Sequence, residues 1–334
     1  MNRSRAAAVT LAAAAVLGGV AYVARRAGAR RRPVGETALA AVGRDLPGDL
    51  EHHFVPVDDG GVIHAVERGK GLPIVLVHGV SLGVATWAPQ LHQLAGHHRV
   101  IAIGQRGHGQ SVAGEGGYRL ERLADDLLVV LAALEVNGAV LVGHSMGGMV
   151  CQLLAVTHPH ELRRHVAGLV LVATSAGPVV PGPGGAALRA AMVAVAVRGL
   201  GHSERRGKEL VPRDPVGAWI TRTCFGSHPR AADVQLTRSM LDAMSPTAMA
   251  GLMGPLLSFD VRRELVGLDW PTHVVVGSRD LLTPPRMARV MAGAISDADL
   301  TIFSGCGHMV MLERAEELND LLGRFAGALA TAGR

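Results

Sequence analysis

A serine, an aspartate and a histidine lie along this chain in an order that could support nucleophilic catalysis. Ser145 is the centre of Gly143-His144-Ser145-Met146-Gly147, Asp280 follows Gly277-Ser278-Arg279, and His308 ends Ser304-Gly305-Cys306-Gly307-His308. A serine hydroxyl is a weak nucleophile near neutral pH, so it needs a base and a third group that orients the base. We therefore predict that Ser145 attacks a carbonyl, that His308 takes its proton and that Asp280 orients His308.

Each of these residues follows an apolar run that is typical of a short buried strand. The runs cover residues 139–142, 272–276 and 299–303, and the first of them is followed by a helix-like segment at 146–157. A strand that turns sharply into a helix holds a serine hydroxyl at the tip of the turn, and flanking glycines leave room for the strained backbone. The alternative for the Gly-x-Ser-x-Gly sequence alone is an ordinary glycine-rich turn.

Acyl transfer also needs backbone N–H groups for the oxyanion that forms on the carbonyl oxygen. One donor is expected from the residue after the nucleophile and one from a loop after an earlier strand. Met146 follows Ser145, and Val80 follows the apolar run 74–77 and the pair His78-Gly79. We predict that the backbone N–H groups of Val80 and Met146 form the oxyanion hole.

Strands and helices alternate from residue 50 onward, which favours a parallel sheet wrapped by helices. The chain opens with an expected hairpin over 54–57 and 62–66. The remaining strands are expected at 73–77, 99–103, 139–142, 168–173, 272–276 and 299–303, and the helices at 119–135, 146–157, 285–295 and 313–329.

Five motifs in order resemble those of the α/β-hydrolase superfamily, of the lid-bearing esterase, lipase and cofactor-free haloperoxidase kind. They are His78-Gly79 with Trp87, Arg106-Gly107-His108-Gly109-Gln110-Ser111, the Ser145 turn, Gly277-Ser278-Arg279-Asp280, and Gly307-His308 with Leu312-Glu313. The resemblance implies a mostly parallel eight-stranded sheet flanked by helices. It also implies a core over 33–176 and 270–334, with a helical cap over 177–269 inserted after the sixth strand. Within the cap, helix-like segments are expected at 186–197 and 236–244.

The resemblance implies a carboxylic-ester hydrolase that works through an acyl-enzyme without cofactor or metal, on a small-molecule ester. A lipophilic ester is expected from an apolar cap and from the membrane anchor that residues 6–24 suggest. Carbon–carbon bond hydrolysis, perhydrolysis, acyl transfer to another acceptor and a non-catalytic binding protein of the same fold stay open. Epoxide hydrolases and haloalkane dehalogenases need a carboxylate where this chain has Ser145. For the acid, Asp297 and Asp299 are alternatives to Asp280; some relatives place it after the sixth strand, where Thr174-Ser175 stands here.

One position departs from the family pattern, because Gly104 stands where members often carry an aspartate before the Arg-Gly-His-Gly motif. We expect altered packing of this loop rather than lost chemistry. His78 and His108 are expected to make structural hydrogen bonds, and His144 to pack beside the serine. The three cysteines, Cys151, Cys224 and Cys306, imply neither a disulfide framework nor a metal site.

Charge is concentrated at the start of the chain. The 334 residues carry a net charge of +5, and residues 1–32 contain seven arginines and no acidic residue. The remainder is close to neutral, so no nucleic-acid partner is expected. Residues 6–24 are uncharged and long enough as a helix to cross a bilayer core of about 30 Å.

The uncharged run predicts a membrane anchor over 6–24, so that residues 1–32 form the anchor and its basic flank. A cleaved signal peptide is the alternative, which the arginines after the run oppose. More arginines follow the run than precede it, so a catalytic domain facing the cytoplasm is expected at the cell membrane. The oligomeric state stays open.

Overall fold

The computed structural model describes residues 46–178 and 221–332, and within them an eight-stranded sheet forms the centre of the molecule. The strands lie side by side in the order β1-β2-β4-β3-β5-β6-β7-β8. Pairing is antiparallel between β1 and β2 and between β2 and β4, and parallel at every later step. The predicted α/β-hydrolase architecture is confirmed. The strands are Glu51–Pro56, Val62–Arg68, Pro73–Val77, Arg99–Ile103, Ala139–His144, Val166–Val172, Thr272–Gly277 and Asp299–Phe303.

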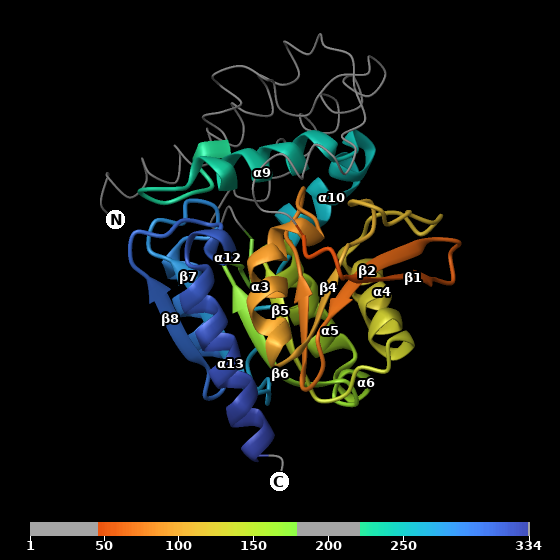
Figure 1. Cartoon of the computed structure of the whole chain (residues 1–334). Helices are drawn as coiled ribbons and strands as arrows, with labels where there is room; N and C mark the ends of the chain where they lie inside the picture. Colours follow the sequence, from red (N-terminus) through yellow and green to blue (C-terminus); the bar gives the residue numbers. More distant parts are fainter. Residues whose placement is uncertain (1–45, 179–220, 333–334) are drawn as a thin grey trace.

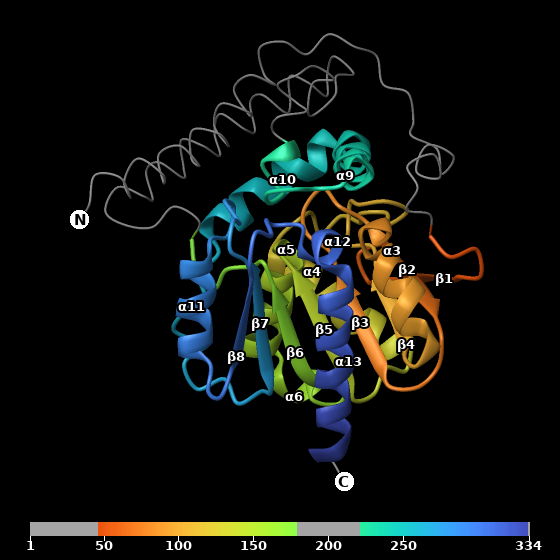
Figure 2. The ribbon, with the colours of Figure 1, turned by 60° about the vertical axis from the view of Figure 1, so that its left-hand side comes forward.

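Helices cover both faces of this sheet (Figures 1 and 2). One face carries α4, α5 and α11, and the other carries α3 and α13, as the two groups of buried apolar side chains show. The helices of the sheet layers are α3 (Ala88–Gln93), α4 (Leu120–Ala133), α5 (Met146–Thr157), α6 (Pro159–Leu162), α11 (Pro285–Ala294), α12 (Val310–Glu313) and α13 (Ala315–Ala332), with 3-10 turns at Val84–Trp87 and Leu94–Gly96.

The alternation of side chains along each central strand builds these two cores. In β3, Val75 and Val77 point to one core, while Ile74 and Leu76 point to the other. Because both faces are covered by helices, every residue of β3 and β5 is buried. The chain therefore uses continuous Val, Ile, Leu and Ala runs, and the parallel strands bring their carboxyl ends to one edge of the sheet.

Two further helices, α9 (Ala231–Ala243) and α10 (Pro246–Ser258), lie between β6 and β7 in the chain. They lie across the carboxyl ends of the strands, above the sheet layer (Figures 1 and 2). This is the position expected of a cap, although the boundaries 177–269 remain a prediction. The sequence predicts a helix at 236–244, and α9 covers most of it; the helix expected at 186–197 lies outside the described residues.

The structure does not support the prediction of a membrane anchor over residues 6–24, and we correct it. In the described part of the chain, no helix combines the length and apolarity needed to cross a bilayer, and residues 6–24 lie outside that part. The absence of charge was a weak basis for the prediction, since the run consists largely of alanine and glycine rather than strongly apolar residues. The membrane partner, the cell-membrane localisation and the cytoplasm-facing domain all depended on this span and are withdrawn.

Candidate active site

Ser145 lies at the tip of the turn between β5 and α5 in a strained conformation. Its φ of 51° and ψ of −117° lie outside the regions that L-residues ordinarily occupy. The turn closes tightly, because a Cβ on Gly143 would lie 2.6 Å from the Gly147 carbonyl oxygen, and one on Gly147 would collide with the carbonyl oxygen of Val77. The glycines are therefore required where the turn meets α5 and β3.

The backbone of Ser145 is held on both sides. Its N–H donates to the Val172 carbonyl oxygen at 3.0 Å, and its own carbonyl accepts from the hydroxyl of Thr174 at 2.7 Å and from the N–H of Met149 at 3.1 Å. Thr174 was not recognised from the sequence as a support of the serine. These bonds fix the strained residue against the end of β6.

Asp280, in the loop after β7, is in direct contact with His308, in the loop after β8. Asp280 Oδ2 accepts from His308 Nδ1 at 2.9 Å, and both side chains are buried. The other carboxylate oxygen accepts from the N–H groups of Leu282 and Thr283 at 2.8 and 2.9 Å, and the Thr283 hydroxyl donates to Oδ2 at 2.8 Å. With Nδ1 donating to the carboxylate, a neutral His308 has its Nε2 lone pair free to act as a base.

The other acids considered from the sequence are placed differently. Asp299 is exposed and begins β8, so it lies at the opposite end of that strand from the loop of His308. Asp297 lies in the preceding turn with a φ of 53°. At the end of β6, the hydroxyl of Ser175 donates to the carbonyl oxygen of Gly177 at 2.7 Å.

His144 connects the serine turn to the histidine loop. Its ring Nε2 donates to the His308 carbonyl oxygen at 3.0 Å, and the two ring centroids are 4.8 Å apart. Complete burial holds the pKa of His144 well below its ordinary value, so the ring is neutral at physiological pH. The residue next to Ser145 thus touches both the backbone and the ring of His308.

The loop after β3 carries the predicted oxyanion donor Val80 and approaches the serine closely. A Cβ on Gly79 would lie 2.9 Å from His144 Nδ1 and 3.0 Å from Ser145 Cβ. Val80 is half-buried, and Met146, the first residue of α5, is fully buried. The loop carrying Val80 therefore lies against Ser145, and α5 begins at the next residue.

Two buried histidines attach this loop to the Arg106 segment. His78 donates from Nδ1 to the Gly79 carbonyl oxygen at 2.7 Å and accepts at Nε2 from the Gln105 N–H at 3.0 Å. His108 accepts at Nε2 from the Ser81 N–H at 3.1 Å. Burial lowers the pKa of His78 to about 3 and that of His108 to about 4. Both rings are neutral, and each makes the structural bonds expected of it.

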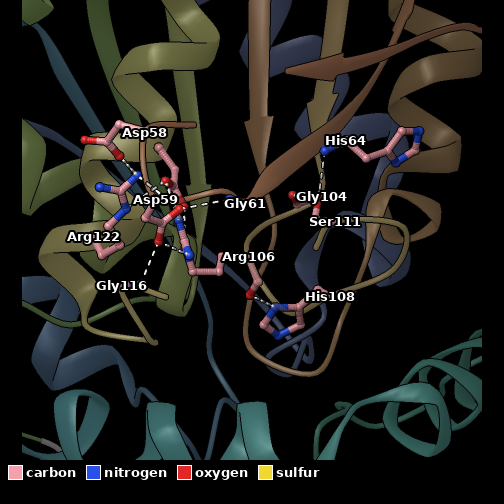
Figure 3. A network of polar contacts seen from close by, with 11 residues as sticks. Asp58, Asp59, Gly61, His64, Gly104, Arg106, His108, Ser111, Gly116 and Arg122 are labelled. Carbon is pink, nitrogen blue, oxygen red and sulfur yellow. Dashed lines mark hydrogen bonds and ion pairs between the residues drawn. The ribbon is translucent and has the colours of Figure 1, made fainter. Parts of the chain in front are cut away.

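Arg106 is the centre of a buried ion network (Figure 3). Its guanidinium bonds Asp126 at 2.7 and 2.9 Å and Asp59 at 2.7 and 3.1 Å, while Arg122 joins from the surface. Burial alone would lower the pKa of Arg106, but its bonds to Asp126 and Asp59 hold it above the ordinary value. The network fixes the Arg106 loop against the β1–β2 turn and α4.

At Gly104, where relatives often have an aspartate, a serine supplies the polar contacts. The Ser111 hydroxyl donates to the Gly104 carbonyl oxygen and accepts from the His64 N–H at 2.9 Å (Figure 3). A Cβ at Gly104 would lie 3.3 Å from both the His64 carbonyl oxygen and Ser111 Oγ. Ser111 therefore joins this loop to β2 without a carboxylate at position 104, in line with the altered packing expected there.

An open cavity of about 190 Å³ adjoins this edge of the sheet. It lies between the end of β6 and the start of α11, and its walls include Ser175, Gly177, Arg262 and Met287. Among the described residues, no group of three or more His, Cys, Asp or Glu side chains could hold a metal ion.

Comparison with known proteins agrees with this fold. Residues 74–321 match the model of the alpha/beta hydrolase family. The 2-hydroxymuconate semialdehyde hydrolase of Pseudomonas sp. (strain CF600) is 29% identical over 268 residues, which cover 78% of this chain and 88% of that protein.

Two solved structures of similar chains are a hydrolase and an esterase. A hydrolase from Pseudomonas aeruginosa PA01 is 27% identical with a TM-score of 0.69, covering 84% of this chain and 99% of that one. A thermophilic esterase from Thermogutta terrifontis is 25% identical with a TM-score of 0.70, over the same shares of the two chains. With a family match that spans most of its length, this chain belongs to the α/β-hydrolase family.

Proposed function

We propose that the protein is a serine hydrolase that cleaves a carboxylic ester, with Ser145, His308 and Asp280 as its catalytic residues. The observation that carries the proposal is the buried 2.9 Å bond between Asp280 and His308, in a loop that touches the neighbour of Ser145. The strained turn at Ser145 adds support, because such strain persists where function requires it. The lipophilic character expected of the substrate depended on the membrane anchor and an apolar cap; the anchor no longer supports it, and it forms no part of the proposal.

In the proposed reaction, Ser145 Oγ attacks the ester carbonyl while His308 Nε2 takes its proton. The N–H groups of Val80 and Met146 stabilise the oxyanion, and Asp280 stabilises the imidazolium. The tetrahedral intermediate collapses, the proton passes from His308 to the departing alcohol, and an acyl-Ser145 ester remains. Water, deprotonated by His308, then attacks this ester, releases the carboxylic acid and restores the serine.

The test is covalent labelling of the full chain with a fluorophosphonate, together with hydrolysis of p-nitrophenyl acetate. Ser145→Ala and His308→Ala are expected to abolish labelling and to lower turnover by up to about 10⁶-fold. Asp280→Asn is expected to lower turnover by about 10⁴-fold, because the ring loses its preferred tautomer. Ser258→Ala, at the exposed end of α10, is the control and keeps wild-type labelling.

A folded wild-type protein that neither labels nor turns over esters would refute the proposal. It would favour the binding protein of the same fold that the sequence leaves open.

Hydrolysis of a carbon–carbon bond in a carbonyl-bearing substrate is the second candidate. The similarity to a 2-hydroxymuconate semialdehyde hydrolase favours this reaction over perhydrolysis and over acyl transfer to an acceptor other than water. A direct comparison settles the choice, because both activities use an activated serine and both are lost in Ser145→Ala. The kcat/KM for 2-hydroxymuconate semialdehyde is compared with that for each ester in a chain-length series. If it exceeds them all, carbon–carbon bond hydrolysis replaces ester cleavage as the proposed function.

A further inference from the structure

The loop of His308 is paired along its length with the chain that leads into α9. The His308 N–H donates to the Cys224 carbonyl oxygen at 2.8 Å, and the Ser227 N–H donates to the Gly305 carbonyl oxygen at 2.9 Å. These two bonds have the register of a short antiparallel pair. We call residues 224–227 the strap. The pair is tight, because a Cβ on Gly226 would collide with the carbonyl oxygen of Gly305.

One side chain, Glu313, bonds both members of this pair. Its Oε2 accepts from the Gly226 N–H at 2.7 Å, and its Oε1 accepts from the Gly307 N–H at 2.9 Å. The thiol of Cys306 lies 3.7 Å from Oε1. Glu313 ends the short helix α12 and is half-buried. The carboxylate thus bridges the strap and the residue that precedes His308.

The opposite side of the histidine loop is also in close contact. A Cβ on Gly277, at the end of β7, would collide with the carbonyl oxygens of Gly307 and Cys306. The loop therefore lies between β7 and the strap, and Glu313 bonds both the loop and the strap. Main-chain hydrogen bonds and close packing join the strap to the loop, so a shift of the strap is expected to shift the loop as well.

We propose that Glu313 is a positioning residue for His308, and that it makes the placement of this base depend on the seating of the strap. Glu313 bonds no atom of His308 itself and acts through Gly307 and Gly226. The inference rests on the proposed function, because it takes His308 as the base. A misplacement of about 1 Å in a catalytic group can cost about 100-fold in rate, which sets the size of the effect expected.

The first test replaces Glu313 with glutamine in the full chain. A glutamine keeps one carbonyl oxygen for one N–H, but it turns an amino group toward the other, so one arm of the bridge is lost. We expect kcat for p-nitrophenyl acetate to fall by about 10- to 100-fold while KM changes much less. Glu313→Asp keeps the charge and both oxygens on a shorter side chain and is expected to recover part of the loss. Glu317→Gln, one turn along at the exposed Arg314 pair, is the matched control.

The second test breaks the same bridge from the strap. Gly226→Ala forces the strap away from the loop and is expected to lower kcat as well, whereas Gly323→Ala, where nothing surrounds the new Cβ, leaves it unchanged. Because both changes act on one bridge, the loss in the Glu313→Gln/Gly226→Ala double variant is expected to be smaller than the product of the single losses. Independent, fully multiplied losses would overturn the coupling.

Active-site titration with the fluorophosphonate separates mispositioning from misfolding. If Glu313→Gln lowers the fraction of titratable sites but leaves kcat per titrated site at the wild-type value, Glu313 is only structural and the inference is refuted. A kcat per site equal to wild type with full titration refutes it equally. In both cases a reactive wild type leaves the proposed function standing, whereas a wild type that never reacts refutes the proposed function and the inference with it.

Discussion

Acidification should destabilise this protein well above the pH range in which its carboxylates lose their charge, because it buries neutral histidines. The pKa values of His78 and His108 are lowered from 6.5 to about 3 and about 4, and that of His144 lies well below its ordinary value, chiefly through burial. Below pH 6.5 the unfolded chain binds protons at these rings, whereas the folded chain does not. Stability therefore rises with pH through this window and is lost as the pH falls.

The size of this loss follows from the lowered pKa values of His78 and His108. A histidine that is protonated in the unfolded chain but neutral in the fold lowers the free energy of unfolding. The loss is about 1.4 kcal/mol for each unit by which the pH falls. Between about pH 7.5 and about pH 5, His78 and His108 each remove about 2 kcal/mol, or about 4 kcal/mol together. That is a large share of the total stability of about 5–15 kcal/mol expected of a globular domain.

The assay is urea unfolding at a series of pH values, with wild type and variants compared at each. His108→Gln removes one buried titrating ring, so the difference in unfolding free energy between wild type and variant should shrink by about 2 kcal/mol over this range, whatever the variant costs at neutral pH. Ser258→Ala, at an exposed position that carries no titrating group, is the control, with a difference that stays constant. A constant difference for His108→Gln would refute the reasoning.

Two further substitutions test the supports of the site. Arg106→Ala leaves the carboxylates of Asp59 and Asp126 without their buried partner, so we expect a loss of about 3–5 kcal/mol in urea unfolding at neutral pH; a loss below about 1 kcal/mol would show that water replaces the guanidinium. Thr283→Val removes the hydroxyl that donates to Asp280 Oδ2, so kcat is expected to fall about 10-fold, with Thr283→Ser restoring it; equal rates in both variants would exclude this role.

The order and type of the elements could be predicted from the sequence because each carries its own local signal. Apolar runs marked every strand of the parallel part, and the glycines around Ser145 marked the turn into α5. The predicted ends of β6 differ from Val166–Val172 by one or two residues, since pairing with neighbouring strands, not residue type, decides where a strand stops.

The supports of the site were not predictable in the same way. The hydroxyls of Thr174 and Thr283 bond Ser145 and Asp280, and a threonine in a loop carries no local sign of such a role. The helix α10 was also missed. Its sequence contains Pro255 and two glycines, which argue against a helix locally, and packing of Ala248 and Leu252 into the core outweighs them.

The Arg106 network has a consequence for how the protein opens. The amides of Gly61 and Gly116, far apart in the chain, both donate to Asp59, which Arg106 holds in place. A movement of the carboxylate releases both amides at once, so the β1–β2 turn and the loop before α4 are expected to open as one cooperative unit. Hydrogen exchange at these two glycines should therefore report the same opening free energy, as though they were neighbours in sequence.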